Sequence, residues 1–319
     1  MLTLLFALTG GGFLIALISG FILLRILRRV HALQHAYEDA PQSHQKKTGT
    51  PTMGGIVFIV PLLLLTGLKD VPFVAAMLFL VIACGAVGFL DDVLGITRGK
   101  NQGLRARTKY LATALIAIVF LRFVDGATAI FPRDVLFHAG TYVLTVPHWL
   151  WLVLGILAVT GTIHAVNLTD GLDGLATGTM VPPLIVLAVI GYATQLSVPM
   201  ASALIGLGAC FGFLVFNLHP AKMFMGDTGS LALGALLSGI AIIEGEMLLL
   251  VLIGGVFVAE ALSVILQVTY FKATHGKRIF KMSPLHHHFE LSGWPETKVT
   301  ARFWTASVLL SALGWAVTR

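Results

Sequence analysis

The chain has 319 residues, of which 57% are hydrophobic and only 11% are charged, and its mean hydropathy is +0.91. Soluble domains carry about 25% charged residues, so this composition excludes an ordinary soluble protein and predicts an integral membrane protein. The formal net charge is +6. In a membrane protein such an excess follows the topology of the loops, so we expect no nucleic-acid partner.

The first apolar stretch of the chain precedes its own positive charges. A secretory signal has the opposite order, so we expect residues 4–24 to form a retained membrane helix. The two cysteines, Cys84 and Cys210, lie inside apolar runs and are expected to be small core residues without a disulfide bond.

Ten apolar segments approach the length of about 20 residues that a helix needs to cross a bilayer. They predict an all-α, polytopic membrane protein with a single domain over residues 1–319. Because the number is even, both termini are expected on the same side. In chain order the segments are 4–24, 54–68, 71–90, 110–124, 149–166, 175–194, 200–216, 230–243, 247–268 and 299–317.

The basic residues predict which side that is, because cytoplasmic loops are enriched in lysine and arginine. One alternate set of loops holds only Lys69, Arg133 and Arg319, with Arg122 near a helix end. The other set is therefore predicted to be cytoplasmic, and both termini are predicted to face outward. Its basic residues are Arg25, Arg28, Arg29, Lys46, Lys47, Arg98, Lys100, Arg105, Arg107, Lys109, Lys222, Lys272, Lys277, Arg278, Lys281 and Lys298.

Carboxylates and imidazoles gather at the same predicted cytoplasmic face. A single Asp at a helix end is usually a cap, and "DGLDG" is ordinary turn chemistry. The whole set at one membrane face instead predicts a functional site. Its members are Asp91 and Asp92 at the end of the third span, Asp170 and Asp173 after the fifth, Asp227 after the seventh, and His286, His287 and His288 in the last cytoplasmic loop.

This set of residues is better suited to bind a hard cation such as Mg²⁺ than to bind zinc. Three adjacent histidines cannot all point at one ion, whereas Mg²⁺ is commonly held by one or two carboxylates together with substrate phosphates. Glycines beside the acids would let backbone N–H groups approach an anion. Basic residues such as Lys46, Lys47 and Lys109 add capacity for phosphate. We therefore expect an enzyme that acts on a phosphorylated, pyrophosphate-containing substrate, with a second substrate in the bilayer.

Five motifs, in order along nearly the whole chain, resemble the polyprenyl-phosphate N-acetylhexosamine-1-phosphate transferases. The triple histidine followed by an aromatic residue and Glu, together with "PTMGG", resembles the muramoyl-pentapeptide branch of that family. The motifs are "KKTGTPTMGG" (46–55), "GFLDD" (88–92), "AVNLTDGLDGLA" (165–176), "FMGDTGSLALG" (224–234) and "PLHHHFELSGWPE" (284–296).

The resemblance implies a Mg²⁺-dependent enzyme of the bacterial plasma membrane. It would transfer phospho-N-acetylmuramoyl-pentapeptide from its UDP carrier to undecaprenyl phosphate, with the active site facing the cytoplasm. A second copy of the chain is a possible partner. The alternative within the family is a transferase that moves N-acetylglucosamine-1-phosphate to the same lipid. A transporter is the alternative from another class, but its sites would lie near the bilayer centre.

The resemblance also implies roles for individual residues. Asp227 and Asp92 are the expected metal ligands, and Asp91 is assigned to the lipid phosphate. Phe224 would stack on the uracil ring, against the simpler interpretation that it is apolar filler. The expected catalytic residues are Asp91, Asp92, Asp227, His286 and His287, and the expected substrate-binding residues are Lys47, Thr52, Lys109, Asn167, Asp170, Gly171, Leu172, Asp173, Asn217, Phe224 and His288.

Two histidines depart from the family pattern. His164 precedes "AVN" where a residue such as Asn is expected, and His219 stands where an aromatic such as Tyr is expected. We expect neither to contact a motif acid. Glu260 lies inside the ninth span, where a carboxylate is costly unless it is paired or hydrated. It is expected to mark a lipid groove or a helix break, and Gly254 and Gly255 nearby fit a bend.

Overall fold

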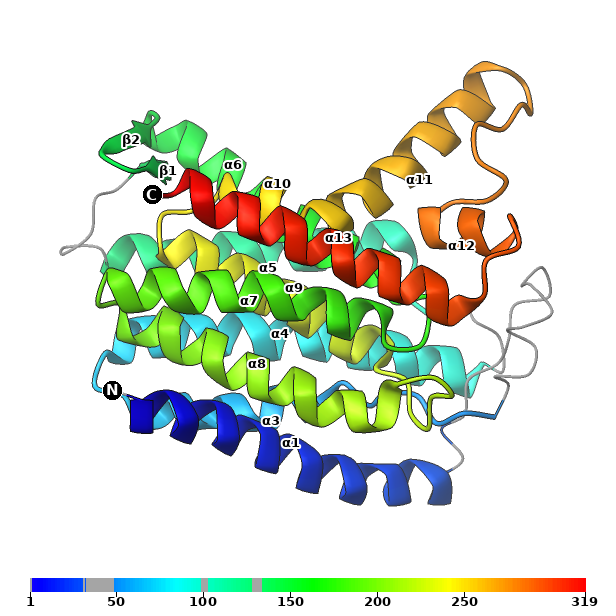
Figure 1. The fold of residues 1–319 in the computed structure, drawn as a ribbon, viewed down its shortest axis with the longest axis horizontal. Helices are drawn as coiled ribbons and strands as arrows, with labels where there is room; N and C mark the ends of the chain where they lie inside the picture. Colours follow the sequence, from blue (N-terminus) through cyan, green and yellow to red (C-terminus); the bar gives the residue numbers. More distant parts are fainter. Residues whose placement is uncertain (1, 31, 33–48, 99–102, 128–133) are drawn as a thin grey trace.

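The computed structural model describes residues 2–30, 32, 49–98, 103–127 and 134–319. Long helices dominate these residues, which confirms the predicted all-α, polytopic membrane class (Figure 1). Within the described part of the chain, eight helices are long and apolar enough to cross a membrane. They are α1 (Leu2–Arg29), α4 (Val71–Thr97), α5 (Ala106–Ala127), α6 (His148–Thr169), α7 (Leu175–Ala193), α8 (Ser197–Asn217), α9 (Gly226–Ile243) and α11 (Gly255–Ala273).

The other two predicted spans are helical but differ from these eight. The segment predicted at 54–68 forms α3 (Ile56–Leu62) and a short 3₁₀ helix, η1 (Leu63–Gly67). The segment predicted at 299–317 lies in α13 (Glu296–Val317), which is long but begins with polar residues. Ten helical segments were therefore located correctly, and eight of them have the character of membrane spans by length and composition.

The predicted ninth span, 247–268, is interrupted. A short α10 (Leu249–Ile253) ends at Gly254, and α11 begins at the next residue. The bend expected from the two adjacent glycines is confirmed. After α11 the chain forms the short α12 (Leu285–Glu290), which contains the triple histidine, before it enters α13.

Helix α9 lies at the centre of the bundle. Every residue from Thr228 to Ile243 is buried, as expected for a helix that is apolar on all sides. It packs against α4 and α6 on one side and contacts α8 and α7 on the other. Consequently α9 connects the two ends of the molecule through its interior.

A small antiparallel hairpin caps one end of the bundle. Its strands are β1 (Val135–Ala139) and β2 (Tyr142–Thr145), which lie between α5 and α6 in the chain. The N–H of Gly140 donates to the carbonyl of Thr318 at 3.3 Å, so the C-terminus lies beside the hairpin. Figure 1 shows both termini at this same end, which confirms that they share one side.

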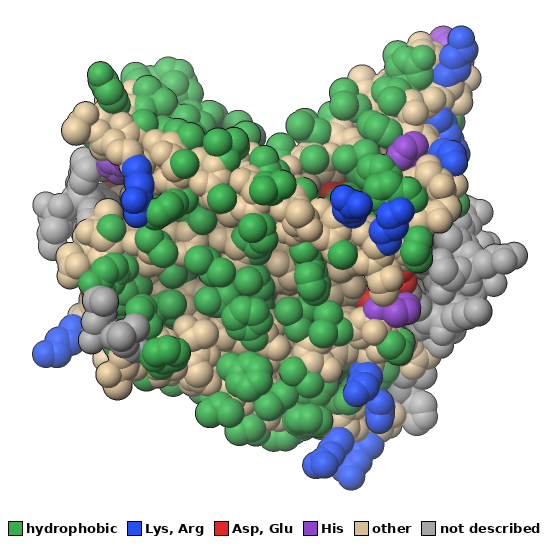
Figure 2. All heavy atoms as spheres, in the orientation of Figure 1, with side chains coloured by type: hydrophobic (Ala, Val, Ile, Leu, Met, Phe, Trp, Pro, Cys, Tyr) green, Lys and Arg blue, Asp and Glu red, His purple; other side chains and the backbone are tan. Residues whose placement is uncertain are grey.

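The outer surface suits a lipid environment. Large apolar side chains are exposed along the helix flanks, among them Phe6 on α1 and Leu111 on α5, at 74% and 67%. Figure 2 shows apolar atoms across the middle of the visible face, with most lysine and arginine side chains toward its ends. In water such a surface would drive association, whereas a bilayer covers it.

Candidate active site

The acidic motifs meet at the end of the bundle opposite the termini. Asp91 and Asp92 were predicted to end a span, but α4 continues to Thr97, so they lie about one and a half turns inside the helix. Asp227 was predicted to precede a helix and is instead the second residue of α9. These shifts place all three carboxylates against neighbouring helices.

Lys109 joins two of the acids. Its ammonium lies 3.1 Å from Oδ1 of Asp91 and also forms an ion pair with Oδ2 of Asp227. Asp91 additionally accepts the backbone N–H of Leu104 at 2.7 Å. All three charged side chains are partly buried, at 14%, 22% and 16% exposure for Asp91, Asp227 and Lys109. The partial burial strengthens these interactions relative to a fully exposed surface pair.

Asn167, near the end of α6, holds Asp227 from the other side. Its amide nitrogen donates to Oδ1 of Asp227 and to the hydroxyl oxygen of Ser230, both at 2.8 Å. Both oxygens of Asp227 therefore have partners from different helices. The carboxylate is fixed in orientation by α5 and α6 before any ligand binds.

Asp92 has a different environment from its neighbour Asp91. It accepts the backbone N–H groups of Asp227 and Thr228 at 3.0 Å each, and the hydroxyl of Thr228 at 2.6 Å. It therefore caps the N-terminus of α9, where a negative charge is favourable. Gly226 permits this approach, because its φ is +67° and a Cβ there would lie 2.6 Å from Oδ2 of Asp92.

The donors at this end are of the type that divalent cations take, although among the described residues the three carboxylates do not form a group with metal-ligand spacing. Asp91, Asp92 and Asp227 contribute three carboxylates, and Lys109 is the ammonium that bridges two of them. Carboxylate oxygens are the ligands that Mg²⁺ prefers, and negative charge remains after Lys109 is counted. The predicted metal ligand Asp227 lies at the centre of this group, whereas the predicted ligand Asp92 uses its oxygens to hold α9.

The "DGLDG" turn between α6 and α7 is held by Asn217. The side-chain oxygen of Asn217 accepts the N–H of Gly174 at 3.1 Å and the hydroxyl of Thr177 at 3.2 Å, and its nitrogen donates to the carbonyl of Met223. Asn217 is buried. Its amide thus positions the turn that contains Gly171 and Leu172. Asp170, the first residue of this turn, is the C-cap of α6.

Asp173 lies in a cluster that sequence analysis missed. Its Oδ2 lies 2.9 Å from Nδ1 of His219, and its N–H donates to Glu296 at 2.6 Å. The expectation that His219 contacts no motif acid is therefore wrong, because the turn after α8 places it on Asp173. Ligating atoms of these three residues lie within 4.8 Å of one another. The other departure, His164, contacts Thr113 at 3.1 Å and stacks on Tyr110.

The three adjacent histidines turn toward three different partners. The N–H and Nδ1 of His286 both lie 3.2 Å from Oε1 of Glu260. Nδ1 of His287 lies 2.9 Å from Glu290, and His288 accepts the N–H of Lys281 at 3.1 Å. One oxygen of the buried Glu260 carboxylate is thus paired, whereas Oε2 has no hydrogen-bond partner among the described residues.

His286 also packs on the "DGLDG" turn. A Cβ at Gly171 would lie 2.2 Å from Nε2 of His286, so glycine is needed for this contact. The contact connects α12 to the turn before α7, which are far apart in sequence. The structure therefore brings the triple histidine and the acidic turn to one place, as predicted for a shared site.

Two chain segments form the remaining side of the site. The N–H of Phe224 donates to Pro51 at 2.8 Å, and the N–H of Gly54 donates to the carbonyl of Phe224 at 2.8 Å. These bonds fix Phe224 beside the "PTMGG" segment, where Thr52 is buried. Lys47, the predicted phosphate contact on this segment, lies outside the described residues.

Comparison with known proteins gives the class. Glycosyl transferase family 4 matches residues 74–245, more than half of the chain, and this region contains Asp91, Asp92, Asn167 and Asp227. The fold and the site thus define a polytopic membrane glycosyl transferase.

Similar full-length proteins narrow the class. The phospho-N-acetylmuramoyl-pentapeptide-transferases of Bacillus pumilus (strain SAFR-032) and Bacillus subtilis (strain 168) are each 45% identical over 315 residues, covering 95% of this chain and 94% of the relative. The one from Heliobacterium modesticaldum (strain Ice1) is 44% identical over 308 residues, covering 94% and 93%. This chain belongs to the phospho-N-acetylmuramoyl-pentapeptide-transferase family.

Proposed function

We propose that this protein transfers phospho-N-acetylmuramoyl-pentapeptide from its UDP carrier to undecaprenyl phosphate. UMP leaves and lipid I forms, which is the first membrane step of peptidoglycan synthesis. The observation that carries the proposal is the meeting of Asp91, Lys109 and Asp227 in one ion-paired group at the bundle end. The names of the relatives favour the muramoyl-pentapeptide substrate over N-acetylglucosamine.

The site is proposed to face the cytoplasm of a bacterial plasma membrane. Arg28 and Arg29 end α1, and Lys272 ends α11. These helix ends lie toward the site in Figure 1, and lysine and arginine mark the cytoplasmic side. Both substrates carry phosphates, so the same positive charge would attract the soluble one.

The main task of the site is to bring two anions together. A phosphate monoester has its second pKa near 6, so the lipid phosphate is largely a dianion at pH 7 and is already a nucleophile. An oxygen of the lipid phosphate forms a bond to the sugar-side phosphorus, and the bond from that phosphorus to the UMP oxygen breaks. UMP leaves with the electron pair. Asp227 would hold Mg²⁺, and the ion would supply neutralisation of the phosphate charge.

The protein side chains position the reactants. Lys109, between Asp91 and Asp227, places a positive charge where the two phosphates approach. Asp91 orients the lipid phosphate and takes up its remaining proton. Asp92 acts on Asp227 by fixing the first turn of α9. Gly171, Leu172, Asp173 and Phe224 are proposed to bind the uridine, with His287, His288 and Lys47 toward the phosphates and the sugar.

The function is tested by supplying the purified protein with undecaprenyl phosphate and one UDP-sugar at a time. We expect UMP release with UDP-N-acetylmuramoyl-pentapeptide and none with UDP-N-acetylglucosamine. Chelation of Mg²⁺ should stop release, and added Mg²⁺ should restore it. Release with the second sugar alone would identify the sister activity, and uptake of either sugar without UMP release would support a transporter.

Direct transfer is distinguished from a covalent route by leaving out the lipid. Labelled UDP-sugar and Mg²⁺ without undecaprenyl phosphate should release no stoichiometric burst of UMP. A burst with label retained on Asp91 or Asp92 would establish a phospho-enzyme and refute direct displacement.

A further inference from the structure

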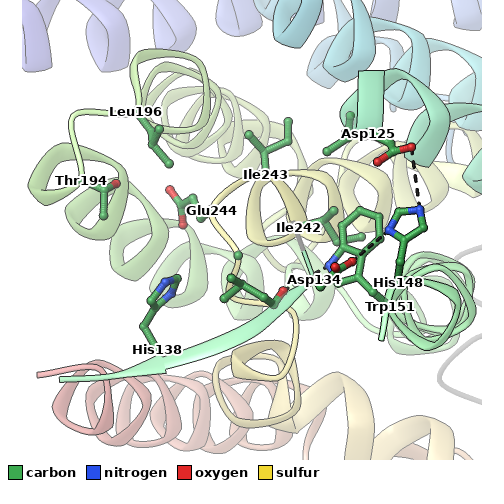
Figure 3. A pocket seen from close by; sticks show the side chains of 13 residues that line it. Asp125, Asp134, His138, His148, Trp151, Thr194, Leu196, Ile242, Ile243 and Glu244 are labelled. Carbon is green, nitrogen blue, oxygen red and sulfur yellow. Dashed lines mark hydrogen bonds and ion pairs between the residues drawn. The ribbon is translucent and has the colours of Figure 1, made fainter. Parts of the chain in front are cut away.

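A cavity of about 170 Å³ lies at the other end of α9, beside the hairpin (Figure 3). The end of α5, strand β1, the start of α6, the α7–α8 connection and the end of α9 all contribute to it. Since α9 has 18 residues that each rise 1.5 Å, the cavity is about 27 Å from Asp227. It is therefore separate from the candidate active site.

Glu244, which follows α9, lines this cavity and is unusual. Its side chain is nearly fully buried, at 5% exposure, and neither carboxylate oxygen has a partner at ordinary hydrogen-bond geometry among the described residues. Gly191 makes room for the carboxyl group, because a Cβ there would lie 2.7 Å from Oε1. A buried carboxylate is costly without a partner, so this group either keeps a proton or takes a cationic ligand.

The neighbouring acids, in contrast, are paired with histidines. Nδ1 of His148 lies 2.9 Å from Asp134 and its Nε2 lies 3.8 Å from Asp125. Nδ1 of His138 lies 2.9 Å from Oε1 of Glu246. In Figure 3 the Asp134–His148–Asp125 group lies on one side of the cavity, with Glu244 apart from it. Among the described lining residues, Glu244 is thus the acid that lacks such a partner.

The rest of the cavity wall favours an apolar body. Leu196, Ile242, Ile243 and Trp151 line it. A cavity of about 150 Å³ takes up a molecule the size of benzene, so this one has room for a ligand of similar size with one polar group. The side chain of His148, which also lines the cavity, is 40% exposed. Among the described residues, the carboxylate and imidazole atoms here form no group with metal-ligand spacing.

We propose that this cavity binds a small organic monocation of the alkyl- or arylammonium class. The ammonium pairs with the Glu244 carboxylate, and the hydrocarbon part packs on the apolar wall. Water alone would hydrate the carboxylate without neutralising it, and a neutral apolar ligand would leave its oxygens unpaired. An ammonium ion satisfies both the charge and the hydrogen-bonding capacity of the group.

The test uses benzylammonium as the probe and benzyl alcohol as its uncharged counterpart of equal size. Binding to the detergent-purified full-length protein is measured by calorimetry and by thermal shift. We expect Glu244→Gln to weaken benzylammonium binding about tenfold or more. Asp70→Asn, which removes a carboxylate at the same end of the bundle, should leave it unchanged. Benzyl alcohol should bind the wild type and Glu244→Gln equally.

The pH dependence gives an independent check. Burial raises the pKa of Glu244 well above its usual value, and the negative charge of Glu246 adds to this rise. A backbone hydrogen bond with Gly191 lowers the pKa, but only in part. The affinity for benzylammonium should therefore rise with increasing pH, as Glu244 loses its proton. His138, His148, Asp125 and Asp134 also face the cavity and are present in both proteins, so Glu244→Gln serves as the reference.

Equal benzylammonium affinity in the wild type and Glu244→Gln would overturn the proposal, as would absence of binding to the wild type. Leu196→Phe is a second variant in case the first does not fold. It fills the cavity while keeping Glu244, and we expect it to remove binding. Unchanged binding to Leu196→Phe would locate the amine elsewhere, in the detergent or on another face, and would also overturn the proposal.

Discussion

The two ends of α9 hold their carboxylates in opposite ways. At the start of the helix, Asp227 and Asp92 are bound by an ammonium, an amide, a hydroxyl and backbone N–H groups. At its end, Glu244 is more deeply buried and has no partner at ordinary hydrogen-bond geometry among the described residues. One buried helix thus joins a preorganised polar group to an acid whose carboxyl oxygens have no side-chain partner among the described residues.

The difference shows what each end can do. Groups held by several neighbours keep their geometry while charge moves, which is the requirement for electrostatic catalysis. An uncompensated buried carboxylate instead makes its surroundings respond to protons and to cations. Variants at the two ends of α9 should therefore have different effects. Those at the Asp227 end should lose turnover, and those at the Glu244 end should change the stability of the protein and its dependence on pH.

The largest effect is expected for Asp227→Asn. The amide is a poor replacement for a carboxylate on Mg²⁺ and loses the ion pair with Lys109. We expect UMP release to fall at least about a hundredfold, measured with saturating substrates across a range of Mg²⁺ concentrations. Asp70→Asn is the matched control and should retain activity. Near-wild-type activity of Asp227→Asn at low Mg²⁺ would show that the metal assignment is wrong.

Asp92→Ala should reduce both stability and turnover. It removes the acceptor for two backbone N–H groups and one hydroxyl at the start of α9, which is expected to cost about 1–3 kcal/mol. The midpoint of thermal unfolding in detergent measures this loss. If Asp92 were only a metal ligand, its removal would stop turnover and leave the unfolding midpoint unchanged in the absence of Mg²⁺.

The two adjacent acids also show what the sequence alone could predict. Apolar run length located the helical segments, and the resemblance implied separate roles for Asp91 and Asp92. Which role belongs to which residue depends on contacts made by residues far away in the chain. The cap that Asp92 forms on α9 spans 135 positions, and no local pattern reveals it.

The same limit applies to the paired histidines. Glu260 at mid-helix was expected to mark a lipid groove or a helix break, because a carboxylate there is costly unless it is paired or hydrated. That the partner is His286 depends on how α12 folds back onto α11. The contact between His219 and Asp173 was missed because the two residues lie on separate turns. Glu244 gave no signal in the sequence, since an acid at a helix end usually faces solvent.

Phe224→Ala should have a smaller effect, confined to nucleotide affinity. Stacking of an aromatic ring on a base is worth about 1–3 kcal/mol, so we expect KM for the UDP-sugar to rise about tenfold with little change in kcat. Steady-state kinetics of UMP release separate the two parameters. Phe224→Tyr keeps the ring and should restore KM. A fall in kcat with unchanged KM would remove Phe224 from the uridine site.

The smallest effect on turnover is expected at the other end of α9, for Glu244→Gln. Burial and the nearby charge of Glu246 raise the pKa of Glu244, so the native protein keeps a proton that the unfolded chain releases above its usual value of about 4.3. The native state binds more protons, and stability must therefore fall as the pH rises. The unfolding midpoint of the wild type should therefore fall as the pH is raised above this usual value.

Glutamine does not titrate, so Glu244→Gln should flatten this slope while UMP release at pH 7 stays near the wild-type rate. Glu246 contributes a slope of the same sign, because burial raises its pKa, although His138 opposes the shift. The flattening is therefore partial. Glu244→Leu removes the polar group altogether and should be the more stable variant at pH 8, since an apolar residue of similar volume carries no desolvation cost. If the unfolding midpoint varies with pH in the same way in all three proteins, Glu244 does not cause the slope. The carboxyl group of Glu244 would then have partners in solution, as the carboxylates at the other end of α9 do.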